Sequence, residues 1–214
     1  GGLQDNGTLH YFGSPAWAAA IGADGGWCAI HPTDKTIMYG ETQWGGIAKS
    51  TNGGANFFSI SAGRPQTTAD WNFIPPFVLS PSSPNILYAG SRNVFKSTDA
   101  GTSWFSANGS AFLNGTNISC LGVSSTDANI VIAGTGDGRL GVTPLFEVFR
   151  SSTGGSAWTK VSAGLPNRYP TDIEFDPTNN AVVYLTYSGY GTAHLFKSTD
   201  VGTTWANISS TLPD

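Results

Sequence analysis

Three aspartates in glycine-rich segments are the residues of this chain best suited to acid–base chemistry. Asp5 lies in Gln-Asp-Asn-Gly, Asp24 in Asp-Gly-Gly and Asp137 in Asp-Gly-Arg. General acid–base catalysis uses carboxyl groups placed beside the bond that reacts. Asp5 with Asp24 or Asp137 is therefore a candidate catalytic pair. Sequences of the Asp-Asn-Gly and Asp-Gly-Gly type also form ordinary turns, and a turn-forming role is the alternative for each aspartate.

A second group of residues is suited to ligand binding. Trp44 lies between glycine-rich turns, and Trp71 lies in a polar stretch. Exposed indole rings beside Asp, Asn and Gln can stack on the C–H faces of sugars. Gln43 and Arg92 lie in the same kind of loop and complete the predicted ligand-binding set. Two other tryptophans are expected to fill cores between sheets, with sugar stacking as the alternative: Trp17 and Trp27.

A repeated pattern of nine residues indicates the framework that positions these side chains. A basic residue is followed by Ser-x-Asp-x-Gly-x-x-Trp, with the serines at 50, 97, 151 and 198, so the steps are 47, 54 and 47 residues. A period of this length predicts a repeat architecture. Two copies depart from the pattern: Asn52 and Thr153 replace the acid, and Phe57 replaces the tryptophan. We expect structural roles for Ser50, Asn52, Gly54, Ser97, Asp99, Gly101, Trp104, Ser151, Gly155, Trp158, Ser198, Asp200, Gly202 and Trp205.

The segments around each copy predict four short strands per repeat. An apolar run and a polar hairpin precede every turn, as in the hairpin that ends Asn85-Ile86-Leu87-Tyr88-Ala89-Gly90. Four short antiparallel strands are one blade of a β-propeller. We therefore predict an all-β fold with about four blades, part of a larger propeller of six to eight blades. The predicted boundaries are residues 1–16 for the end of a preceding blade, then 17–214 with blades near 20–61, 72–108, 117–163 and 170–210.

The pattern Ser-x-Asp-x-Gly-x-x-Trp resembles the Asp-box, or BNR repeat. Asp-box propellers include sialidases, xyloglucan-cleaving endoglucanases, sortilin-type receptors and photosystem II assembly factors. The resemblance implies that each box lies in the turn between the third and fourth strands, on the outer rim of its blade. There the acid would accept backbone hydrogen bonds and the tryptophan would pack. Asp99 and Asp200 are therefore expected to be structural rather than catalytic.

The resemblance also bears on catalysis. Xyloglucan-type endoglucanases carry a catalytic Asp in a Thr-Asp-x-Gly-Gly loop, and this chain has Gln43 at that point of Thr42-Gln43-Trp44-Gly45-Gly46. An amide can act neither as a general acid nor as a general base, so this blade is predicted to lack catalytic activity. Asp5 takes the corresponding place in the first loop. Sialidase activity is not expected, because the Arg-Ile-Pro motif found near the start of sialidases is missing.

Composition excludes several classes of function. The formal net charge is −4, and the ten Lys and Arg residues are scattered, which argues against nucleic-acid binding. No apolar run is long enough to predict a membrane-spanning helix. Cys28 and Cys120 are expected to be two separate buried thiols. The three histidines lack the spacing of a metal site, so neither a metal nor a cofactor is predicted.

Three functions are consistent with the sequence, and we give the preferred one first. The first is an extracytoplasmic scaffold that binds a carbohydrate or other ligand, with the remaining blades of a larger propeller as partners. The second is a glycoside hydrolase that acts on xyloglucan or a related β-glucan. The third is a propeller that binds proteins during assembly. A second acid facing Asp5 across a groove would favour the hydrolase, whereas burial of Asp5 and Asp24 in turn hydrogen bonds would favour binding.

Overall fold

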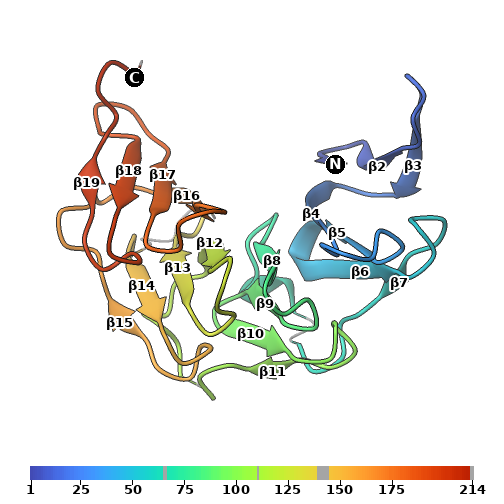
Figure 1. Ribbon diagram of the computed structural model, residues 1–214, viewed down its shortest axis with the longest axis horizontal. Helices are drawn as coiled ribbons and strands as arrows, with labels where there is room; N and C mark the ends of the chain where they lie inside the picture. The colour runs from blue at the N-terminus through green and yellow to red at the C-terminus, as the bar shows by residue number, and fades with distance from the viewer. Residues whose placement is uncertain (65–66, 110, 139–144, 213–214) are drawn as a thin grey trace.

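The chain forms five antiparallel sheets that follow one another around an arc (Figure 1). A computed structural model describes residues 1–64, 67–109, 111–138 and 145–212. Apart from two single-turn 3-10 helices, the regular elements in these ranges are strands. The first sheet has three strands and the other four sheets have four each. The predicted all-β fold of four-stranded antiparallel blades is confirmed.

Each sheet contains consecutive strands in chain order. The partial blade comprises β1 (Gly2–Leu3), β2 (Gly7–Tyr11) and β3 (Trp17–Ile21). Blade 1 comprises β4 (Gly25–Ile30), β5 (Met38–Thr42), β6 (Gly46–Ser50) and β7 (Phe58–Ser59). Blade 2 comprises β8 (Phe77–Leu79), β9 (Leu87–Gly90), β10 (Val94–Ser97) and β11 (Phe105–Ser106). Blade 3 comprises β12 (Ile118–Val123), β13 (Val131–Thr135), β14 (Val148–Ser151) and β15 (Thr159–Lys160). Blade 4 comprises β16 (Pro170–Phe175), β17 (Val183–Tyr187), β18 (Leu195–Ser198) and β19 (Ala206–Asn207).

The first blade boundary differs from the prediction. Strand β3 pairs with β2, with Tyr11 opposite Trp17, so the partial blade ends at residue 21 rather than 16. The turn before β3, residues 12–16, lacks the box pattern. Strand β3 takes the place of a fourth strand in its blade, and the sequence therefore does not mark where it begins. The register places Trp17 where the other sheets have the aromatic residue that closes the box.

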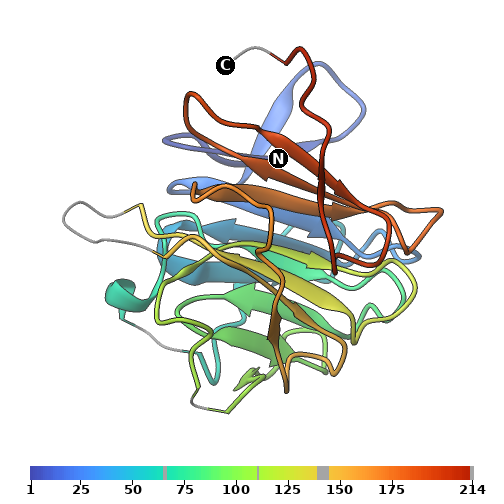
Figure 2. The ribbon, with the colours of Figure 1, turned by 90° about the vertical axis from the view of Figure 1, so that its left-hand side faces the viewer.

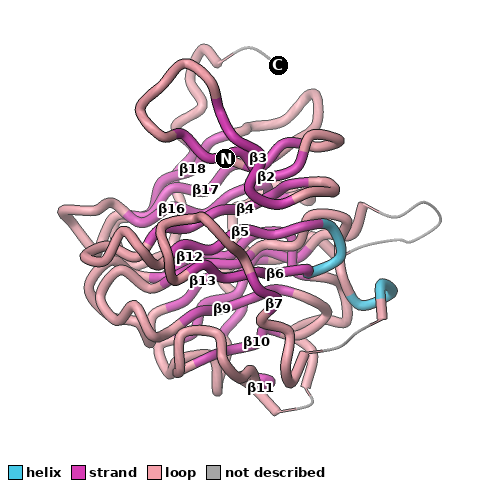
Figure 3. Tube along the Cα trace, turned by 90° about the vertical axis from the view of Figure 1, so that its right-hand side faces the viewer, coloured by secondary structure: helices cyan, strands magenta, loops and turns pink. Residues whose placement is uncertain are grey.

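Because neighbouring strands are antiparallel, the segments that connect them lie on two opposite sides of the molecule. The loop face carries the turns between second and third strands and the connections between blades. The 3-10 helices η1 (Gln43–Gly45) and η2 (Thr68–Asp70) both lie there, at one edge of the strands in Figure 3. The box face lies at the opposite ends of the strands, and Figure 2 shows these two edges in profile. Its segments are residues 51–57, 98–104, 152–158 and 199–205.

Hydrogen bonds inside the four box turns follow one plan. The serine hydroxyl accepts the N–H of the glycine four residues later, at 2.8 Å for Gly101 and Gly202. The side chain at the acidic position accepts a second backbone N–H, and it does so as Asp99, as Asn52 or as Thr153. The turn therefore needs an acceptor at this position rather than a negative charge. Asp99 and Asp200 do not belong to the lining of the cleft on the loop face or of the hollow formed by the first strands.

Cores between neighbouring blades hold the arc together. The Trp104 indole is 4% exposed, and its N–H donates to the Ile60 carbonyl of blade 1 at 2.7 Å. Trp205 makes the same contact with the Val161 carbonyl at 3.1 Å. Trp27 packs against the core between blades 1 and 2, as expected. Blades 2 and 4 are thus bonded to their predecessors through the tryptophan of their own box, whereas the Trp158 N–H of blade 3 donates to the Gly155 carbonyl within its box.

The two cysteines are free, and their environments differ. Cys120 is buried in the core between blades 3 and 4, where burial raises the pKa of its thiol to about 12. Cys28 is exposed, so the prediction of two buried thiols is wrong for this residue. It lies on β4, next to the partial blade. That sheet has three strands and lacks the inner strand that covers this position at the other interfaces.

Candidate functional site

The loop face brings Asp5, Asp24 and Gln43 together. The Asp5 N–H donates to Asp24 Oδ1 at 2.7 Å, and the Asp24 N–H donates to Gln43 Oε1 at 3.1 Å. Asp5 itself has a left-handed backbone with φ of 63°. The Asp24 carboxylate and the Gln43 amide therefore act as acceptors that hold the connection between the partial blade and blade 1. Asp24 is half-buried in this turn, whereas the Asp5 side chain is exposed and only its backbone N–H takes part.

Asp137 follows strand β13 of blade 3 and directly precedes Gly138. Its side chain is only 6% exposed. It lies close to Tyr169, whose pKa is raised to about 12, first by burial and then by the negative charges of Cys120 and Asp137. Asp5 and Asp24 are thus hydrogen-bonded neighbours, and Asp137 is a buried carboxyl group contributed by blade 3.

A cleft of about 430 Å³ opens on the loop face across blades 1 to 3. Its lining residues are Trp44, Asn72, Phe73, Ile74, Gly138 and Tyr169. Trp44 and Phe73 are each 38% exposed and meet edge to face, with ring centroids 5.2 Å apart. The cleft thus presents flat apolar rings to solvent beside polar groups. This volume falls in the range of ~300–1,000 Å³ that is usual for small-ligand sites.

A strained turn presents Trp44 to the cleft. Its φ of 62° and ψ of 33° lie in the left-handed region, which a large side chain seldom adopts. The Trp44 N–H donates to the Phe73 carbonyl at 2.9 Å and fixes the turn to the next blade. Gly45 follows with φ of 79°, and a Cβ there would lie 2.8 Å from the Trp71 ring. Only glycine allows this turn to sit directly on that ring.

The prediction that Trp71 is an exposed stacking ring is wrong. Trp71 is 2% exposed and lies beneath the turn that carries Trp44. The Arg64 guanidinium lies over Trp71 at 5.4 Å and over Trp104 at 5.0 Å, and its Nη1 donates to the Gly45 carbonyl at 2.8 Å. The polar neighbours of Trp71 suggested a surface position, but the indole fills the gap between blades 1 and 2. It supports the site from below.

A buried carboxyl group lies under the same part of the loop face. Glu41 is 0% exposed, and its Oε1 accepts the Trp27 N–H at 3.0 Å. Its Oε2 is buried without a hydrogen-bond partner. Burial raises the pKa of this carboxyl well above its usual value, although the Trp27 N–H and the Arg64 charge oppose the shift. The sequence did not mark Glu41 or Arg64, because their burial depends on contacts between distant segments.

Arg92 is engaged with its own surroundings rather than with the cleft. Its Nε and Nη2 both donate to the Gly115 carbonyl at 3.3 Å, and its guanidinium lies 4.7 Å from the Phe112 ring centroid. The Arg92 N–H donates to the Asp70 carbonyl. Arg92 thus fastens two loop segments and is not among the residues that line the cleft, and its role in ligand binding stays a prediction.

Of the six residues that line the cleft, only Trp44 was predicted from the sequence, and Asn72, Phe73, Ile74, Gly138 and Tyr169 were not. Asn72 is 5% exposed, and its Nδ2 donates to the Ile118 and Gly136 carbonyls at 3.0 and 2.8 Å. It also lies 3.4 Å from the Tyr169 hydroxyl. Asn72 thus joins blade 2 to blade 3 beneath the cleft. Its position beside Trp71 in a polar stretch was the one available signal, and Tyr169 carried none.

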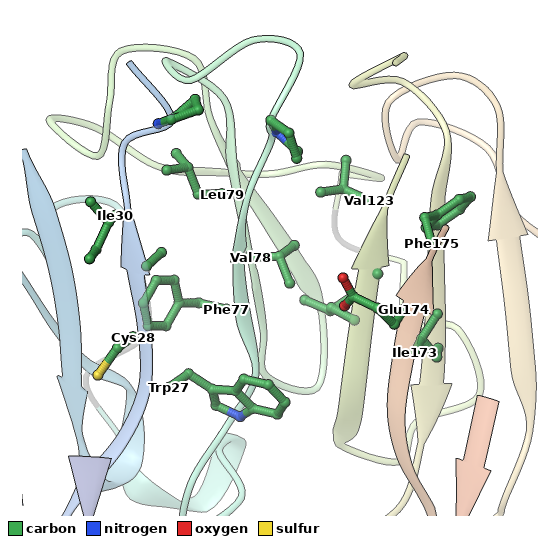
Figure 4. A pocket seen from close by; sticks show the side chains of 15 residues that line it. Trp27, Cys28, Ile30, Phe77, Val78, Leu79, Val123, Ile173, Glu174 and Phe175 are labelled. Carbon is green, nitrogen blue, oxygen red and sulfur yellow. The ribbon is translucent and has the colours of Figure 1, made fainter. Parts of the chain in front are cut away.

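A second hollow, of about 340 Å³, lies along the axis of the arc (Figure 4). The first strands of all four complete blades line it, mostly with apolar side chains such as Trp27, Phe77 and Val123. Glu174 is its one charged lining residue and points inward from β16. Burial and then Asp172 raise the pKa of the Glu174 carboxyl.

The described ranges show no group of three His, Cys, Asp or Glu side chains that could hold a metal ion. Within the same ranges, no helix has the length and apolar character needed to span a membrane.

Comparisons with known proteins agree with this architecture. No family model matches the chain. A xyloglucanase of Hypocrea jecorina (strain QM6a) is 28% identical over 201 residues, which are 88% of this chain and 22% of that protein. The GH74 xyloglucanase from Xanthomonas campestris superposes with a TM-score of 0.64 at 18% identity, over 87% of this chain and 30% of that one. YCF48 from Cyanidioschyzon merolae superposes with a TM-score of 0.51 at 16% identity, over 80% and 53% respectively.

These matches show partial similarity to GH74 xyloglucanase propellers and a fold shared with YCF48. The chain spans about a fifth to a half of the length of these relatives. It therefore corresponds to part of a larger propeller in each of them.

Proposed function

We propose that this chain binds a glycan in the cleft formed by Trp44, Phe73 and Tyr169, as part of an extracytoplasmic propeller scaffold. The exposed edge-to-face pair of Trp44 and Phe73 is the observation that carries the proposal. Aromatic rings provide apolar contact area of defined geometry, and a pyranose ring has matching C–H faces. Asn72 and Tyr169 place polar groups at the same cleft. The partial similarity to xyloglucanase propellers favours a β-glucan as the ligand.

Binding is favoured over hydrolysis by the state of the carboxylates. Asp24 accepts a backbone N–H in its turn, Asp137 is buried, and Gln43 stands where the related loop carries its acid. The Asp5 carboxyl group is exposed, but none of the three aspartates is among the residues that line the cleft. The cleft therefore offers a surface for a sugar ring but lacks a pair of carboxyl groups that could act as general acid and general base.

A glycoside hydrolase is the second candidate, because Asp5 and Asp24 are hydrogen-bonded neighbours and the similar protein is a xyloglucanase. A protein-binding propeller is the third, and the apolar hollow along the axis supports it.

A polysaccharide panel separates these candidates. Native affinity electrophoresis in gels containing xyloglucan, mixed-linkage β-glucan or starch measures retention, and reducing-sugar release from the same polymers measures hydrolysis. We expect retention by a β-glucan without sugar release. Sugar release that disappears in the Asp5→Asn or Asp24→Asn variant would establish the hydrolase instead. Absence of retention by every polymer would refute glycan binding.

A further inference from the structure

Blade 1 buries two ionisable side chains, Glu41 and Arg64, at positions where the other blades have uncharged residues. Glu41 is paired in register with Ile47 on the third strand, and the equivalent positions of blades 2 to 4 hold Gly90, Gly134 and Thr186. Arg64 is the fifth residue after the fourth strand, and the equivalent residues of blades 2 to 4 are Ala111, Leu165 and Leu212. The repeat itself therefore does not require a charge at either position. Blade 1 is also the blade that presents Trp44 to the cleft.

The Glu41 carboxyl group lies against the inner side of a residue that lines the cleft. A Cβ atom added to Gly26 would clash with both Glu41 Oε1 and Ile74 Cγ2, so these two side chains meet at the same small space. Ile74 is part of the cleft lining. Glu41 Oε1 accepts the Trp27 N–H, and its Oε2 is buried without a hydrogen-bond partner among the described residues. This arrangement suits a neutral carboxyl group, because a buried charge needs a partner.

The Arg64 guanidinium holds the turn that carries Trp44. Its Nη1 donates to the Gly45 carbonyl at 2.8 Å, and its Nη2 donates to the Ile60 carbonyl at 3.2 Å. Gly45 directly follows Trp44, whose own N–H donates to the Phe73 carbonyl. The turn is thus fastened to blade 2 through Trp44 and to the end of blade 1 through Arg64. A movement of the guanidinium would release the second of these two attachments.

Glu41 changes its charge at a pH at which Arg64 is still a cation. Burial lowers the pKa of the Arg64 guanidinium to about 10, and the Glu41 charge opposes this shift. Burial also raises the pKa of the Glu41 carboxyl well above its usual value. In the described ranges, Arg64 is the one charged group that acts on Glu41, and its neighbours Gly26, Trp27 and Ile74 are uncharged. An ionised Glu41 therefore has a single cation to attract.

We propose that the charge of Glu41 sets the position of Arg64 and thereby regulates glycan binding at the cleft, an inference that rests on the proposed function. While the carboxyl group is neutral, Arg64 stays on the Gly45 carbonyl and Trp44 is held in place. When the carboxyl group loses its proton, the buried negative charge draws the guanidinium away from that carbonyl. The turn then loses an attachment, and the cleft loses its fixed shape. The glycan is therefore bound more tightly at acidic than at alkaline pH.

Hydrogen–deuterium exchange tests the coupling between Glu41 and the turn without any glycan. Mass spectrometry of a peptide that contains residues 43–47 measures the exchange of this segment, and Glu41→Gln serves as a permanently neutral reference. Comparison of the two proteins at the same pH cancels the direct effect of pH on exchange. We expect equal rates near pH 5 and exchange about five-fold or more faster in the unmodified protein near pH 9. Equal rates at both pH values would overturn the proposal.

Arg64→Leu is a second variant that tests the path of the coupling. Leucine already stands at the equivalent position of blade 3, where Leu165 packs against the core between blades 3 and 4, so the substitution suits the repeat. Without the guanidinium, residues 43–47 should exchange at the faster rate at both pH values. A variant that still shows the change with pH would mean that Glu41 acts without Arg64, and this result would overturn the proposal.

Isothermal titration with a xyloglucan oligosaccharide completes the test. We expect the affinity of the unmodified protein to fall about five-fold or more between about pH 5 and pH 9, and that of Glu41→Gln to stay at its acidic level. Glu147→Gln is the matched control and should keep the pH dependence, because the Glu147 carboxyl group accepts hydrogen bonds from Lys160 and Asn114 instead.

The two measurements separate the failure of this proposal from the failure of the proposed function. Binding whose affinity does not change with pH would overturn the regulation by Glu41 and leave glycan binding in place. Absence of binding at every pH, together with the expected exchange difference, would refute the glycan as ligand and support the control of the turn by Glu41.

Discussion

The box face and the loop face are made by the same repeat, yet they use their polar residues in different ways. On the box face, Asp99, Asn52 and Thr153 are interchangeable because each accepts the same backbone N–H. On the loop face, each turn has its own length and side chains, and the turn of blade 1 exposes Trp44. The difference indicates that the boxes serve folding, whereas the loops are free to differ and to bind a ligand.

The largest expected effect is a difference in stability between a substitution on the box face and one on the loop face. Trp104→Ala removes a buried indole and its hydrogen bond to the Ile60 carbonyl. We expect it to lower the free energy of unfolding by about 3–5 kcal/mol. Trp44→Ala, on the loop face, should cost about 1 kcal/mol or less. Urea unfolding measures both, and equal losses would contradict the division of roles.

The next effect separates the faces by binding. Trp44→Ala removes the ring that lines the cleft and should weaken glycan affinity about ten-fold, which is about 1.4 kcal/mol. Trp17→Ala is the matched control, because Trp17 is also exposed but lies outside the cleft. Isothermal titration with a glycan retained in the electrophoresis gels measures both. An affinity that falls equally in the two variants would remove Trp44 from the site.

A smaller effect tests the buried acid beneath the loop face. The pKa of Glu41 is raised in the folded state, so its stabilising contribution is complete below the unfolded value near 4.5 and is lost as the pH rises through the folded value. Glu41→Gln removes this dependence. Its stability relative to the unmodified protein should therefore increase between pH 4.5 and 8, as measured by urea unfolding. A difference that is constant over this range would show that Glu41 is charged when folded.

The smallest effect has the opposite sign and concerns the box face. Hydrogen bonds from the hydroxyl and the N–H of Ser103 lower the pKa of Asp99 to about 2. Its contribution is present above the unfolded value near 3.8 and is lost as the pH falls from about 4 to 2. Asp99→Asn keeps the acceptor, as Asn52 does, so it should change little at pH 7 and should reduce the acid sensitivity. A large loss at pH 7 would mean that the charge itself matters.

The repeat made the fold predictable, because box turns and hairpins are local features. The sheets of the four complete blades lie within the predicted segments, and the boundary failed only at β3, where no box marks the strand. Side-chain exposure was harder to predict, because it depends on neighbouring blades. Trp71 turned inward under Gly45, whereas Cys28 and Trp17 are exposed because no neighbouring strand covers them. Trp44 lies at a cleft, but Tyr169, on its other side, comes from more than a hundred residues away.

A crystal structure with a bound xyloglucan oligosaccharide tests the central claim most directly. The account predicts a sugar ring over Trp44, between Phe73 and Tyr169, with the four box turns unliganded. A sugar held by Asp99 or Asp200, or one bound on the loop face away from Trp44, would contradict it.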